Sequence, residues 1–136
     1  MIDLHIEDFC HDIIKTLLRL YEAFPSKHSV YIDEIAGPME LDEYGLPSDR
    51  HQRCLGAMLW LQQENIILID DVIPQQAIDQ ASLTLTSYRA LTQQRFIEQK
   101  PRQFVESFRE VLAEGSSEKT KRVAHDFLDC FLALQK

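Results

Sequence analysis

The stretch Ala81–Gln93 changes its periodicity partway along, and this change constrains the fold more than any other feature of the sequence. Residues 82–86 alternate polar and apolar side chains with the period of two that is typical of a strand. Leu85, Tyr88 and Leu91 then follow at the three-residue spacing of one helical face. A strand is therefore predicted to run directly into a helix, with the hydroxyl of Thr86 as the helix cap.

A partner for this strand is predicted a short distance upstream. Residues 66–69 form an apolar run that ends at two aspartates, as expected for a strand that is buried at its start and solvated at its end. Residues 72–80 contain Pro74 and are predicted to form the tip of a β-hairpin. The preceding helix is expected to stop at Asn65, because asparagine tolerates the left-handed conformation better than most residues.

Helical periodicity also marks the N-terminal half of the chain. A single apolar face recurs through residues 6–24, with Asp3 as the expected N-cap and Pro25 as the stop. A short strand at residues 30–32 and a short helix capped by Asp33 are predicted next. A longer helix, capped at Ser48 or Asp49, is predicted to follow an acidic, solvated connection and to lead into the hairpin.

Two further helices are predicted after the hairpin. Pro101 is expected in the first turn of the first of them, and Gly115 at its end. Ser116 and Ser117 open the second, whose apolar stripe is broader than one neighbouring helix would cover. The expected fold class is mainly α with a small β-hairpin.

Three segments carry a resemblance to the winged helix-turn-helix superfamily, and it covers roughly residues 6–98. Ile32-Asp33-Glu34-Ile35-Ala36 resembles the second helix of that superfamily, an apolar residue followed by "xxIA". Residues 55–67 resemble its third helix and exit, "LxxLxxxGhI", with Asn65 at the glycine position. Residues 85–89 resemble the "LTxxG" that ends the wing, with Arg89 where glycine is common. The resemblance implies a winged-helix domain over residues 1–98, and residues 99–136 then form a helical extension packed on it or making a dimer contact.

Composition limits the classes of partner. The chain has 136 residues, 45% of them hydrophobic, which is sufficient for one globular core. The absence of a long apolar run and the acidic start predict a cytoplasmic protein without a membrane span. The formal net charge is −8, and residues 1–50 hold 11 acids against 4 bases. Because phosphates repel this charge, nucleic acid is expected to meet only the middle or the end of the chain.

The resemblance implies a double-stranded DNA interface at the start of the third helix, where arginine and glutamine can pair with base edges. A solvated helix start carries the same residue types, so both interpretations remain open. The resemblance implies a homodimeric DNA-binding transcriptional regulator, in which the first or terminal helices form the contact between the subunits. The residues expected to contact bases or phosphates are Arg50, His51, Gln52, Arg53, Arg89 and Arg95.

The alternative is a winged-helix protein-interaction adaptor within a larger assembly. The hairpin tip over residues 72–80 has no basic residue and one acid, which disfavours phosphate contact. Ile73 and Ile78 are expected to be exposed there and to suit a protein contact.

Neither hypothesis includes catalysis, a cofactor or a metal. The sequence has no P-loop, no dinucleotide-binding glycine motif and no paired Cys-x-x-Cys. The run Cys10-His11-Asp12 and the pair His125 and Asp129 could supply ligands, but neither has a recognised metal-site spacing. The three cysteines are expected to be free thiols.

Overall fold

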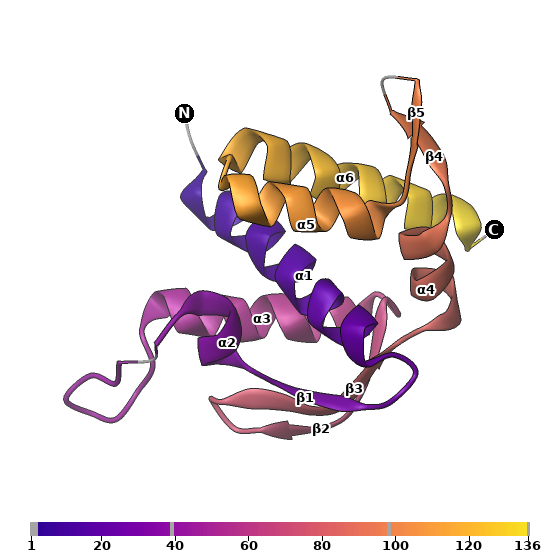
Figure 1. The fold of residues 1–136 in the computed structure, drawn as a ribbon. Helices are drawn as coiled ribbons and strands as arrows, with labels where there is room; N and C mark the ends of the chain where they lie inside the picture. The colour runs from indigo at the N-terminus through magenta and orange to yellow at the C-terminus, as the bar shows by residue number, and fades with distance from the viewer. Residues whose placement is uncertain (1–2, 39, 98, 136) are drawn as a thin grey trace.

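A computed structural model of the protein describes residues 3–38, 40–97 and 99–135. These residues form a mainly helical structure with a small antiparallel sheet, as the sequence predicts (Figure 1). The elements in chain order are α1 (Leu4–Ala23), β1 (His28–Tyr31), α2 (Ile32–Ala36), α3 (Asp49–Gln63), β2 (Ile67–Ile73), β3 (Ala77–Leu83), α4 (Leu85–Thr92), β4 (Arg95–Ile97), β5 (Lys100–Arg102), α5 (Phe104–Glu114) and α6 (Ser117–Leu134).

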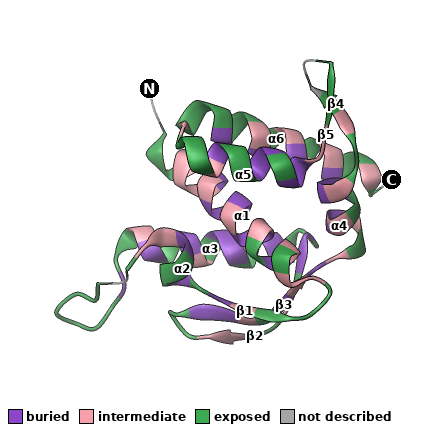
Figure 2. Ribbon diagram, viewed as in Figure 1, coloured by how far each residue is buried: buried purple, intermediate pink, exposed green. Residues whose placement is uncertain are grey.

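Helix α1 lies at the centre of the molecule, with α5 and α6 on one side and α2, α3 and the sheet on the other (Figure 1). Its apolar face is buried from Cys10 through Ile14 and Leu17 to Leu20. Buried residues of α3, α5 and α6 (Figure 2) belong to the same hydrophobic cluster as this face. As predicted, Asp3 is the N-cap of α1, although its side chain makes no capping hydrogen bond.

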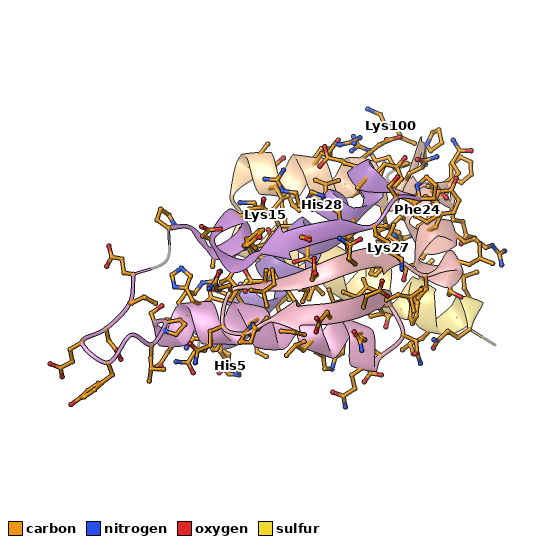
Figure 3. The ribbon with its side chains drawn as sticks, turned by 90° about the horizontal axis from the view of Figure 1, so that it is seen from below. His5, Lys15, Phe24, Lys27, His28 and Lys100 are labelled. Atoms are coloured by element: carbon orange, nitrogen blue, oxygen red, sulfur yellow. The ribbon has the colours of Figure 1, made fainter. Side chains whose placement is uncertain are left out.

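The sheet has the strand order β1-β3-β2, with all pairs antiparallel. The predicted hairpin is confirmed: Ile67 pairs with Leu83, and Ile69 with Ala81. Asn65 has the predicted positive φ, 62°. Figure 3 views the sheet face, where the Lys27 ammonium lies 2.5 Å from the Asp70 carboxylate and so joins the chain before β1 to β2.

Two predicted helix caps are wrong. Thr84, rather than Thr86, caps α4: its hydroxyl accepts from the Ser87 amide and donates to the carbonyl of Ile66. The chain turns into the helix two residues early because this cap also ties it to the start of β2. Helix α2 begins at Ile32 after Tyr31, so Asp33 lies inside its first turn, where the helix dipole favours a carboxylate.

The C-terminal region contains a second hairpin that the periodicity did not predict. Pro101 lies in β5, opposite Phe96 of β4, so its predicted position in a helical first turn is wrong. Helix α5 begins three residues later, at Phe104, and ends as predicted at Gly115, whose φ is 74°. Ser116 caps α6 by accepting from the Lys119 amide.

An aromatic cluster joins α5 to α6. Phe127 meets Phe104 edge to face at 5.6 Å between ring centroids and meets Phe108 at 5.5 Å. These rings belong to the same hydrophobic cluster as the buried residues of α1, α3 and the sheet. Across the described residues, no helix is both long enough and apolar enough to cross a bilayer.

Candidate functional site

The first turns of α3 carry four of the six side chains expected to contact DNA, so the site is built from this point. Ser48 caps the helix, and its hydroxyl accepts from the amide of His51. The segment that precedes Ser48 is a loop between α2 and α3 that projects from one side of the molecule (Figure 1). The start of α3 therefore lies between α1 and this loop, and its side chains contact both.

Arg50 forms a bidentate ion pair with Asp12 of α1. Its two terminal nitrogens each donate a 2.7 Å hydrogen bond to one carboxylate oxygen. The Asp12 side chain is 1% exposed and that of Arg50 is 27% exposed. Burial alone would raise the pKa of Asp12, but hydrogen bonds from His11 and Arg50 outweigh it and leave the pKa below its ordinary value. The hydrogen bonds between Arg50 and Asp12 also raise the pKa of Arg50.

Arg53 is one helical turn further along and is also paired. Its Nη2 lies 3.4 Å from a carboxylate oxygen of Asp8, and the Nε of Arg50 lies 3.5 Å from the other oxygen. Asp8 and Asp12 are four residues apart on α1, so both project from the same helical face. The two arginines of α3 thus lie against two carboxylates of α1.

His51 is buried, which contradicts its expected place on a solvated helix start. Its Nε2 lies 3.0 Å from the carbonyl of Gly37 and its Nδ1 lies 2.6 Å from the hydroxyl of Ser48. A carbonyl can only accept, so Nε2 carries the proton and Nδ1 accepts from the serine in the neutral ring. The imidazole thereby connects the two ends of the loop before α3.

Gln52 is exposed, and its side chain also binds the loop before α3. Its side-chain amide donates a 2.9 Å hydrogen bond to the carbonyl of Pro47. Of the four expected base-reading side chains, two therefore pair with α1 and two hold the base of the loop. Sequence periodicity placed them off the apolar stripe but could not indicate their partners.

The other expected DNA contacts lie elsewhere. Arg89 is exposed in the last turn of α4, and the Arg95 guanidinium stacks over the Phe104 ring at 4.1 Å from its centroid. The loop before α3 projects from one side of the molecule, whereas α4 and β4 lie on the opposite side (Figures 1 and 3). The fold therefore does not bring these two arginines together with Arg50 and Arg53.

The hairpin tip is shorter than the predicted residues 72–80, because β2 runs to Ile73 and β3 begins at Ala77. Ile73 is partly exposed at the end of β2, but Ile78 is fully buried, so its expected exposure is wrong. Ile78 lies in the middle strand of the sheet, where it pairs with Val30 of β1 and with Val72 of β2. The side chain is buried in the core because α1 and α3 pack against β3.

Asp8 and Asp12 are the charged residues of the site that sequence analysis missed. A signal was present: Asp12 lies between the apolar residues Phe9 and Ile13, and the polar residue Thr16, one turn further along, is also fully buried. A carboxylate inside an apolar stripe needs a cationic partner, but periodicity along the chain does not locate Arg50, 38 residues away.

The titratable groups near this site do not form a metal centre. Within residues 3–38, 40–97 and 99–135, no three histidine, cysteine, aspartate or glutamate side chains converge as metal ligands would. Burial, with a smaller contribution from the Asp12 charge, raises the pKa of Cys54 to about 12. This thiol is protonated at neutral pH and is therefore a poor nucleophile.

Comparisons with known proteins gave no match of any of the three kinds. No family model matches the chain, no curated protein matches its sequence, and no solved structure matches its fold.

Proposed function

We propose that the chain is a non-catalytic protein-interaction module built on a winged-helix core. The order α1, β1, α2, α3, β2, β3, with the hairpin after the longer helix, supports the winged-helix part of the proposal. The protein-interaction part of the proposal needs separate evidence, because a fold alone does not specify a function.

The observation that carries the proposal is the pairing of the α3 arginines with carboxylates of α1. A base-reading arginine needs its guanidinium free to form a bidentate contact with guanine. Both terminal nitrogens of Arg50 are already used in a bidentate contact with the Asp12 carboxylate. To release Arg50, the fold would have to give up the bidentate pair at a carboxylate that is 1% exposed and keep the His11 contact alone, which is strongly unfavourable.

Charge at the rest of this face supports the same conclusion. Asp8 compensates Arg53, and Asp49 adds a further negative charge at the start of α3. The hairpin tip carries no lysine or arginine between residues 72 and 80. Because phosphate contacts supply most of the affinity for DNA, a face without net positive charge is a poor duplex-binding surface.

Two measurements test the proposal against DNA regulation. The purified chain is titrated into a labelled random duplex at low ionic strength, together with Arg53→Ala, and no retention of DNA by either is expected. In parallel, the tagged chain is purified from its native source with and without nuclease, and retained proteins are expected to survive the nuclease. Duplex binding that Arg53→Ala weakens, or a bound fraction lost on nuclease treatment, would overturn the proposal.

A further inference from the structure

The loop between α2 and α3 exposes large apolar side chains that the core does not use. Leu41, Tyr44 and Leu46 are 60%, 79% and 42% exposed. Clustered apolar exposure of this kind is typical of interaction sites, whereas isolated exposed apolar residues need no explanation. Tyrosine is also among the residues enriched at protein interfaces.

Hydrogen bonds fix the conformation of this loop. One carboxylate oxygen of Asp42 accepts from the amides of Tyr44 and Leu46, at 2.8 and 2.9 Å. The Asp42 amide donates to the carbonyl of Leu46, and an antiparallel bridge joins Leu41 to Pro47. His51 and Gln52 hold the base, as described above. A loop that is already ordered loses little conformational entropy when it binds.

Two depressions lie next to this loop and share Pro47 and Gln75 in their walls. One, of about 330 Å³, lies between Leu46 of the loop and Leu55 and Leu59 of α3. The other, of about 280 Å³, lies between Leu41 of the loop, Tyr31 of β1 and Pro74 of the β2–β3 turn. Each is large enough for an apolar side chain, and Leu59 and Tyr31 at their edges are each 40% exposed.

Carboxylates are concentrated in the segment that borders these depressions, and Asp33 lines the depression beside Tyr31. Residues 31–49 contain six acids and no lysine or arginine: Asp33, Glu34, Glu40, Asp42, Glu43 and Asp49. In the described part of the chain, none of the six forms an ion pair, whereas Asp8 and Asp12 beside α3 both do. The charge of this region is therefore not compensated within the chain.

We propose that this surface, formed by Tyr31, Leu41, Tyr44, Leu46 and Leu59 with its six carboxylates, binds a lysine- or arginine-rich segment of a partner protein. Apolar side chains of that segment occupy the two depressions, and its flanking cations pair with the carboxylates. The inference rests on the proposed interaction function and adds the chemistry of the partner. A second copy of this chain suits the surface poorly, because its net charge is −8.

A selection with random peptides displayed on phage tests the proposal without a known partner. Peptides are selected on the full chain and then measured individually against wild type, Tyr44→Ala/Leu46→Ala and the matched control Leu132→Ala, whose side chain is 58% exposed on α6. We expect selected peptides to combine leucine, phenylalanine or tryptophan with several lysines or arginines. The double variant should weaken their binding by about tenfold or more, and the control should not.

A charge-reversal variant tests the contribution of the carboxylates independently of the apolar side chains. Glu40→Lys/Glu43→Lys leaves the apolar side chains and Asp42 in place, and should weaken the same peptides most at low ionic strength. The proposal is overturned if no peptide is enriched, if the selected peptides are not basic, or if they bind the loop variants as tightly as wild type. Nuclease-resistant partners that both loop variants still retain would overturn this surface while leaving the interaction function in place.

Discussion

The guanidinium of Arg50 and the carboxylate of Asp12 form a parallel pair of 2.7 Å hydrogen bonds between helices α3 and α1. The two residues are 38 positions apart in the chain, and the carboxylate is almost completely enclosed. The pair sets the position of α3 relative to α1. It also removes the charge that would suit the start of α3 to nucleic acid.

Asp12→Asn should destabilise the fold by about 3 kcal/mol, because it leaves the Arg50 charge without its main partner in a largely buried position. Urea unfolding at neutral pH measures the change. Asp8→Asn is the matched control: its side chain is 32% exposed and its contacts are longer, so a loss of about 1 kcal/mol or less is expected. Equal losses in both variants would contradict the special role of Asp12.

The ion pair between Asp12 and Arg50 predicts that the folded chain loses stability in acid. The pKa of Asp12 is lowered by the fold, so the folded state binds fewer protons than the unfolded state as pH falls below the unfolded value of about 3.9. Its contribution is therefore complete above that pH and is lost as pH falls through the folded pKa. As pH decreases through the acid range, the urea concentration at the unfolding midpoint should fall less steeply for Asp12→Asn than for wild type.

Asn65 occupies a left-handed conformation, with φ of 62°, between α3 and β2. Asn65→Ala should destabilise by about 1 kcal/mol because a Cβ without a polar group disfavours this region. Asn65→Gly should be neutral or slightly stabilising. The two variants differ little in size. If Asn65→Ala unfolds at a higher temperature than Asn65→Gly, the left-handed conformation does not cause the loss of stability.

Phe127 tests whether the C-terminal helices unfold together with the rest of the chain. Phe127→Ala removes a buried ring that contacts Phe104 and Phe108, and should cost about 3–5 kcal/mol. Because these rings share one cluster with α1, far-ultraviolet circular dichroism and the fluorescence of Trp60 on α3 should report the same urea midpoint. A separate, earlier loss of helix would indicate that α5 and α6 unfold independently.

His51 should control the order of the loop before α3. His51→Ala removes the hydrogen bonds to Gly37 and Ser48, so amide exchange across residues 40–47 should accelerate while exchange in α1 does not. Hydrogen exchange followed by mass spectrometry resolves the two regions. Gln93→Ala, an exposed substitution after α4, is the control and should leave the loop unchanged.

Local signals in the sequence predicted most of the elements. The apolar periodicity of residues 6–24, the change of period after Ala81 and the stops at Asn65 and Gly115 all depend on neighbouring residues. The β4–β5 hairpin was missed because its strands have three residues each, too few to establish a period of two. Thr84 and Thr86 are both residue types that suit a helix cap, and the contact of Thr84 with Ile66 distinguishes them only in the folded chain.

The helices, the β2–β3 hairpin and the concentration of acids before residue 50 follow from spacing and composition along the chain. The partners of the side chains at the start of α3 follow instead from how α3 packs against α1. Arg50 and Arg53 have the types that nucleic acid contact requires, but α1 places Asp12 and Asp8 against them. The function of a charged side chain depends on which opposite charge lies within a few ångströms of it, and packing between distant segments sets that distance.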